Sequence, residues 1–117
     1  MEVLEVAEKM EHLITSMSRM RAEIKNRAKA RAETISNYER QISVTIIKLK
    51  NGVRFEVDGE EIQNPPVTII EKIAKGICYE SKLDMELAEG EYKSLITNIE
   101  TVKAELNGLQ SINRHLE

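Results

Sequence analysis

MELAEGEYKSLITNIETVKAELNGLQSINRHL, residues 85–116, is the stretch that decides the fold. Apolar residues recur in it at alternating intervals of three and four, which is the spacing of a coiled-coil seam. It predicts a long helix, although Gly90 and Gly108 each cost about 1 kcal/mol relative to alanine. The a and d positions of this heptad are Met85, Ala88, Tyr92, Leu95, Ile99, Val102, Leu106, Leu109, Asn113 and Leu116.

A second heptad begins near the N-terminus. Past Ile24 its apolar track moves to Ala28 and Ala32 and then to Ile35 and Tyr38. Two consecutive four-residue steps are a stutter, which unwinds a supercoil locally. We predict a first helix over residues 1–43. Its seam residues are Val3, Val6, Met10, Leu13, Met17, Met20 and Ile24.

Between the two helices the apolar period changes from seven to two, which is typical of strands. A three-residue loop, Lys50-Asn51-Gly52, would place Ile47 opposite Phe55 and give the pair one apolar face. A two-residue loop would place Lys48 there instead. We therefore predict a β-hairpin over residues 44–63. The alternating apolar residues are Thr45, Ile47 and Leu49, then Val53, Phe55 and Val57.

A second turn is predicted at Asp58-Gly59, and Glu60–Ile62 after it is a candidate third strand. Asn64-Pro65-Pro66 ends the sheet, because proline donates no ladder hydrogen bond. The second helix, over residues 65–117, begins either at Asn64, with Pro65 as its first residue, or at Thr68, with Glu71 completing a capping box.

Two patterns indicate that the helices pair antiparallel. Seam residues match when paired residue numbers sum to about 112, as for Val6 with Leu106. Independently, this register brings the basic residues 19–31 onto the acidic residues 80–91. The predicted fold is α+β, mainly α: an antiparallel two-helix coiled-coil hairpin with a β-hairpin of two or three short strands at its turn. It forms a single domain, residues 1–117.

Composition narrows the functional classes. Aromatic residues make up 3% of the 117 residues, which favours an elongated architecture packed by aliphatic side chains. The single cysteine, Cys78, excludes an internal disulfide and fits a reducing cytosol. The acidic N-terminal segment does not resemble a signal peptide, and no apolar run reaches the roughly 18 residues of a membrane span. We expect a cytoplasmic protein with no membrane partner.

Self-association is expected, because a two-helix hairpin of this length buries too little surface to be stable alone. The prediction is a homo-oligomer. Asn113 at a seam position could fix the register or the oligomeric state, or it could lie in a fraying terminus.

Basic residues are the candidate ligands of an anion. A block of six between residues 19 and 31 could hold the phosphates of a nucleotide, or it could only neutralise the acidic segment opposite. Lys48 and Arg54 are cross-strand neighbours in the predicted register, so Glu56 or a ligand phosphate would relieve their repulsion. Tyr79 could stack on a nucleobase, or it could cover the base of the β-hairpin. The block consists of Arg19, Arg21, Lys25, Arg27, Lys29 and Arg31.

No recognisable catalytic or DNA-reading motif is present. His12 and His115 lie in different helices without metal-ligand spacing, and Cys78 has no histidine nearby. Gly52 and Gly59 belong to turns rather than to a phosphate loop. The net charge is −3, so duplex nucleic acid is not expected as a partner. We expect a protein that is not an enzyme and has no metal and no cofactor.

The order helix, β-hairpin, helix over the whole chain resembles the β-type subunit of prefoldin, a hexameric chaperone whose coiled-coil arms hold unfolded clients. The likeness is one of architecture. It implies a protein that binds other proteins.

The ending AELNGLQSINRHL, residues 104–116, resembles small accessory proteins of phages and prophages of Gram-positive bacteria. Among these, the nearest functional match is the family of non-enzymatic sponges that counter Thoeris defence. That resemblance implies an oligomer that sequesters cyclic ADP-ribose-type signals or cyclic oligonucleotides in pockets between subunits. Arg54, Tyr79 and Arg114 have the right chemistry for phosphate and base contacts.

The resulting hypothesis is a non-enzymatic phage-type protein that captures a cyclic nucleotide immune signal in the cytoplasm of a bacterial host. The alternatives are a prefoldin-like or structural coiled-coil protein that binds other proteins, and a direct protein inhibitor of a host factor. The candidate ligand-binding residues are Arg21, Lys25, Arg27, Lys48, Arg54, Tyr79 and Arg114.

Overall fold

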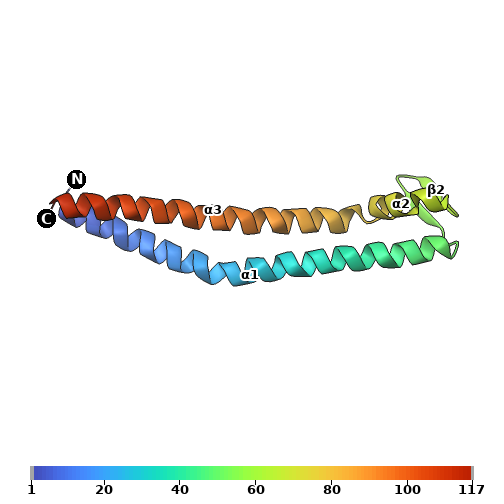
Figure 1. Cartoon of the computed structure of the whole chain (residues 1–117), viewed down its shortest axis with the longest axis horizontal. Coiled ribbons are helices and arrows are strands. Elements are labelled where there is room, and N and C mark those ends of the chain that lie inside the picture. Colours follow the sequence, from blue (N-terminus) through green and yellow to red (C-terminus); the bar gives the residue numbers. More distant parts are fainter. Residues whose placement is uncertain (1, 117) are drawn as a thin grey trace. The chain divides into compact units, whose positions relative to one another are not determined.

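A computed structural model describes residues 2–116, and helices dominate it (Figure 1). The chain forms two compact units, which we call the central unit (residues 30–89) and the terminal unit (residues 2–29 and 90–116). A mainly helical chain with a small antiparallel sheet confirms the coarse fold prediction. In chain order the elements are helix α1 (Val3–Lys50), strands β1 (Phe55–Val57) and β2 (Glu60–Ile62), the 3₁₀ helix η1 (Val67–Ile69), and helices α2 (Ile70–Ile77) and α3 (Tyr79–Leu116).

In the terminal unit, α1 and α3 lie side by side and run antiparallel (Figure 1). Val6, Met17 and Leu106 are buried between them. An ion pair between Arg27 and Glu91 joins the two helices. The heptad pattern is therefore confirmed as the contact line between helices. Further seam residues that are half-buried include Met10, Leu13, Met20, Ile24, Leu95, Ile99, Val102 and Leu109.

The register of this pairing differs from the predicted one. A sum of about 112 would have placed Arg27 opposite Met85, whereas its partner is Glu91, a shift of about one heptad. Both registers bring apolar residues together, because the seam repeats every seven residues. The end of the first helix decides between them: α1 continues to Lys50, so the predicted end at residue 43 is wrong.

The segment predicted as the first strand, residues 44–50, forms the last turns of α1. Ile42, Thr45, Ile46 and Leu49 are three and four residues apart, which is also the period of one helix face. Leu49 is 1% exposed and Ile47 is 59% exposed. In a strand these two side chains would share a face, whereas in a helix they do not. The strand prediction is therefore wrong, because this run carries both periods.

Asn51-Gly52 ends α1 and does not form a hairpin turn. Gly52 has a φ of 79°. Its N–H donates to the carbonyl of Leu49 at 3.2 Å, and the N–H of Val53 donates to the carbonyl of Lys48 at 3.0 Å. This pair of hydrogen bonds is a Schellman motif, in which glycine takes the left-handed position past the helix end.

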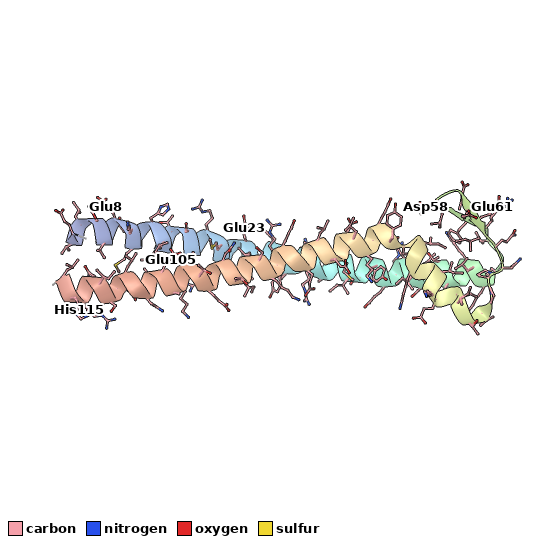
Figure 2. The ribbon with its side chains drawn as sticks, turned by 90° about the horizontal axis from the view of Figure 1, so that it is seen from above. Glu8, Glu23, Asp58, Glu61, Glu105 and His115 are labelled. Carbon is pink, nitrogen blue, oxygen red and sulfur yellow. The ribbon has the colours of Figure 1, made fainter. Side chains whose placement is uncertain are left out.

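The sheet consists of β1 and β2, paired antiparallel with Phe55 opposite Ile62 and Val57 opposite Glu60. Asp58 and Gly59 connect them with φ values of 50° and 81°, which is the signature of a type I′ turn. Figure 2 shows Asp58 and Glu61 on this hairpin. The turn at Asp58-Gly59 and the strand at 60–62 are confirmed, whereas the predicted pairing of Ile47 with Phe55 is wrong.

The core of the central unit lies where α2 and the sheet pack on the end of α1. Its buried centre is Leu49, Ile70 and Ala74. α2 therefore packs against both the end of α1 and the sheet. The residues packed around the centre are Ile42, Ile46, Phe55, Ile62, Ile73 and Ile77.

The predicted second helix, residues 65–117, is interrupted. Cys78, with a ψ of 24°, separates α2 from α3, and no side-chain hydrogen bond caps η1 or α2. Both predicted start points, Asn64 and Thr68, are therefore wrong. Two polar contacts reach α1 from this part of the central unit: the Ser81 hydroxyl of α3 donates to Gln41 Oε1 at 2.8 Å, and Sγ of Cys78, between α2 and α3, lies 3.4 Å from Thr45 Oγ1.

None of the described helices combines the length and the apolar character that crossing a membrane requires.

Candidate protein-binding surfaces

The predicted ligand-binding residues are divided between the two units. Four of them belong to the terminal unit and three to the central unit. The four are Arg21, Lys25, Arg27 and Arg114, and the three are Lys48, Arg54 and Tyr79.

Two members of the basic block form ion pairs with carboxylates of their own units. In the terminal unit Arg27 pairs with Glu91 and lies 3.8 Å from Glu23. In the central unit Arg31 Nε donates to Glu89 Oε2 at 2.6 Å. For these two residues, the structure favours the simple interpretation of the block, in which its charges neutralise the acidic segment of α3. Arg21 and Lys25 are exposed.

Lys48 and Arg54 are not cross-strand neighbours, because Lys48 lies in α1. Arg54 Nη1 donates to Glu61 Oε1 at 2.8 Å, so an acid on β2 already compensates this charge. Lys48 borders a shallow hollow along α1 together with Arg40 and Gln41. Arg114 is exposed, and its Nε lies 3.5 Å from the carbonyl of Gln110. The cross-strand pair of Lys48 and Arg54 that the predicted register implied is therefore wrong.

Tyr79, which could have covered the base of the hairpin, is 60% exposed at the start of α3. Its hydroxyl donates to Glu80 Oε1 at 3.2 Å. The hydrogen bond to this carboxylate, together with the negative charge of Glu80, raises the pKa of Tyr79 above its ordinary value. Because the ring is exposed, a partner can contact it. Because the pKa is raised, the hydroxyl stays protonated at neutral pH.

The contact between Tyr79 and Glu80 is testable by titration. When the NMR signals of the tyrosine rings are followed against pH, Tyr79 is expected to deprotonate at a higher pH than a tyrosine in a short peptide. The variant Glu80→Gln is expected to move this midpoint back down, because the neutral amide no longer disfavours the tyrosinate. A midpoint that does not change in Glu80→Gln would show that Glu80 is not the cause.

Tyr79 is the first of three large apolar side chains that line α3 at intervals of four residues. Leu83 is 53% exposed and Leu87 is 57% exposed. Ser81 is buried against α1, and Leu83 is two residues, or about 200°, round the helix from it. Tyr79, Leu83 and Leu87, which we call the α3 stripe, therefore face away from α1 within the central unit.

Acidic residues border the α3 stripe. Glu80 and Glu86 are each three residues from Leu83, so they are its neighbours on the helix surface. Asp84 extends the acidic border, and Lys82 is the one basic residue within the stretch from Tyr79 to Leu87. The seam analysis missed Leu83 and Leu87, although apolar residues outside the a and d positions are the signal that could have found them.

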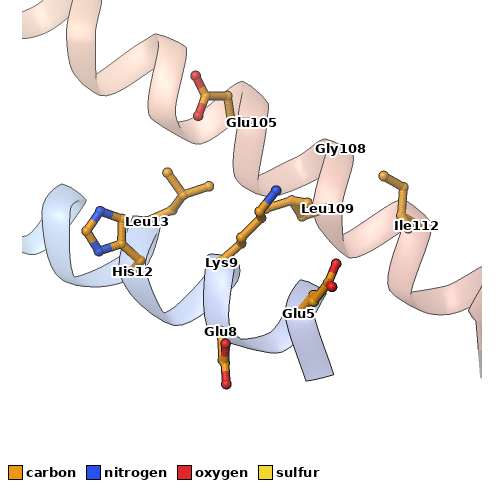
Figure 3. Close-up of a pocket in the computed structure, with 9 residues that line it drawn as sticks. All are labelled: Glu5, Glu8, Lys9, His12, Leu13, Glu105, Gly108, Leu109 and Ile112. Carbon is orange, nitrogen blue, oxygen red and sulfur yellow. The ribbon is translucent and has the colours of Figure 1, made fainter. Parts of the chain in front are cut away.

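A second feature is an open groove of about 700 Å³ between α1 and α3 in the terminal unit (Figure 3). Its apolar lining is formed by Leu13, Leu109 and Ile112. Gly108 also lines the groove, and an added Cβ there would meet no atom within 4 Å. The groove therefore has room on its α3 side.

Charged residues form the rim of this groove. Glu5 and Lys9 reach from α1 toward α3, whereas the carboxylate of Glu8 points away from α3 (Figure 3). Glu105 stands on the α3 side, and His12 completes the α1 side. The three carboxylates outnumber the single lysine, so the rim is a poor site for a phosphate.

Among residues 2–116, no group of three or more His, Cys, Asp or Glu side chains is placed to hold a metal ion. Comparison of the chain with protein-family models, curated proteins and solved structures gives no match.

Proposed function

We propose that this chain is a non-enzymatic protein-binding module whose α3 stripe receives an amphipathic, basic segment of another protein. The observation that carries the proposal is the line of Tyr79, Leu83 and Leu87, each more than half exposed on the face of α3 away from α1. Contiguous exposed apolar surface of this kind is typical of a protein-interaction site.

Burial of the stripe supplies part of the affinity. Covering one large apolar side chain fully contributes about 1.5–3 kcal/mol. The three side chains are 53–60% exposed, so covering each contributes about half of that value, and the charged border has to supply part of what association costs. The spacing of four residues suits a partner helix that presents its own apolar residues at intervals of three and four.

The acidic border supplies the selectivity. Glu80, Asp84 and Glu86 attract a partner with lysine or arginine beside its apolar face, and they repel an acidic one. A partner of opposite charge also associates faster at low salt. The proposed ligand is therefore a basic amphipathic helix.

The phage-type hypothesis, with capture of a cyclic nucleotide or inhibition of a host factor, stays a prediction from the sequence. Phosphate binding by Arg27 or Arg54 would require the ion pairs with Glu91 and Glu61 to open first. The α3 stripe needs no such rearrangement. For this reason we propose protein binding rather than nucleotide capture.

The test is fluorescence anisotropy of the full chain with a dye-labelled helical peptide that carries leucines along one face and lysines beside them. The double variant Leu83→Ser/Leu87→Ser is expected to weaken binding at least tenfold, because two anchors are lost. The control is Leu4→Ser: Leu4 is 68% exposed in the terminal unit, and its replacement is expected to leave the affinity unchanged. A second peptide, with glutamates in place of the lysines, is expected to bind more weakly.

Two outcomes would contradict the proposal. One is equal affinity of the lysine and glutamate peptides together with no effect of the double variant. The other is the absence of peptide binding together with saturable binding of cyclic ADP-ribose or a cyclic dinucleotide, which would favour the nucleotide hypothesis.

A further inference from the structure

The chain itself covers the apolar lining of the groove in the terminal unit only in part: Ile112 is 42% exposed, and Leu13 and Leu109 are half-buried. A groove of this kind fits a partner that contributes a helix, and a second copy of the chain supplies one.

The terminal unit shows where the second copy fits. Along one face of α1 two hollows follow each other. Glu5, Glu8, Lys9 and His12 line the first, which is the groove described above. Ser16, Arg19, Met20 and Glu23 line the second. Each residue of the second set follows one of the first by eleven positions, which is about three helical turns. The two hollows therefore lie on the same face of α1.

The charges on this face reverse sign about Ser16. Lys9 lies seven residues before Ser16 and Glu23 seven residues after it. A helix with this pattern is complementary to a copy of itself that runs in the opposite direction. In that arrangement Lys9 meets Glu23 of the partner subunit, and this contact occurs twice.

The residues between these charges agree with the same arrangement. His12 and Met20 are equally distant from Ser16, so each lies opposite the other in the partner subunit. Arg19 of the partner subunit falls beside Leu13, where Glu105 stands on the α3 side of the groove. The apolar lining of the groove is then covered by the second α1.

We propose that two copies of this chain associate through this face, α1 against α1 and antiparallel, with the two-fold axis at Ser16. The interface lies in the terminal unit and does not use the α3 stripe, so it is independent of the proposed function. It gives the homo-oligomer a defined surface. The occupant of the groove is α1 of a second copy.

The first test is cysteine cross-linking at the axis. In a Cys78→Ala background, Ser16→Cys places two thiols next to each other across the axis, within reach of a disulfide. Ser18→Cys is the matched control, because Ser18 is an exposed serine about 200° round the same helix. Under mild oxidation most of the Ser16→Cys protein is expected to run as a covalent dimer on a non-reducing gel, and little of the Ser18→Cys protein. Equal cross-linking of both, or of neither, would overturn the proposed axis.

The second test uses charge reversal in sedimentation experiments. Lys9→Glu and Glu23→Lys are each expected to raise the dimer dissociation constant at least tenfold, because each creates two like-charge contacts. The double variant Lys9→Glu/Glu23→Lys is expected to restore dimerisation, since the opposite charges meet again across the interface. A double variant that associates more weakly than both single variants would contradict the pairing. So would an unmodified chain that stays monomeric at about 100 µM.

Discussion

Replacing Leu49 with alanine is expected to lower the free energy of unfolding by about 3 kcal/mol. Leu49 is 1% exposed and forms the centre of the central unit with Ile70 and Ala74. Removing most of its side chain leaves a cavity that the packed helices and sheet fill only in part. Urea denaturation followed by circular dichroism measures the loss, at one protein concentration for all variants, because association would shift the midpoint.

The matched control is Ile47→Ala, two residues earlier. Ile47 is 59% exposed, so its replacement is expected to change the free energy of unfolding by no more than about 0.5 kcal/mol. If residues 44–49 formed a strand, Leu49 and Ile47 would share a face and both variants would be costly. Similar losses of unfolding free energy in the two variants would contradict the assignment of residues 44–50 to α1.

Replacing Gly52 with alanine is expected to cost about 1–2 kcal/mol. Gly52 has a φ of 79°, which alanine adopts only with strain. An added Cβ would also lie 3.2 Å from Asn64 Oδ1, so that side chain would have to move. The loss is measured as a lower urea midpoint with an unchanged denaturant slope.

Gly90→Ala serves as the comparison for this experiment. Gly90 lies inside α3, and an added Cβ there would meet no atom within 4 Å. Alanine is the better helix former, so this variant is expected to gain about 0.5–1 kcal/mol. Stabilisation of both variants would show that Gly52 does not end the helix in a Schellman motif.

The helices could be predicted because their seams repeat over many turns. Residues such as Val6, Met17 and Leu106 stand at predicted seam positions and are buried. Their register could not be predicted from the same signal, since a shift of one heptad again brings apolar residues opposite apolar residues. The partner of Arg27 settles the register, and this partner depends on where α1 ends.

The segment around Leu49 could not be assigned from its pattern. Its apolar residues fit a period of two and also a helical period. The β-branched residues among them are common in strands and favoured the strand prediction, which is wrong. The burial of Leu49 beside Ile70 comes from α2, which is distant in sequence. By contrast, Asp58-Gly59 was recognisable because its turn chemistry is local.

The candidate site was predictable only in part. Tyr79 was a candidate for stacking on a ligand, and it is exposed at the start of the α3 stripe. The pair of Lys48 and Arg54 depended on the strand register and failed with it. Leu83 was missed because the seam analysis gave no role to apolar residues on the outer face of α3.

Residue-resolved NMR can show whether the α3 stripe binds a basic amphipathic helix. The ¹⁵N-labelled full chain is titrated with the lysine-flanked leucine peptide. We expect the largest amide shifts between Tyr79 and Leu87, and we expect them to vanish in the Leu83→Ser/Leu87→Ser variant. Shifts centred on the groove at Leu13 and Leu109, or no shifts at all, would contradict it.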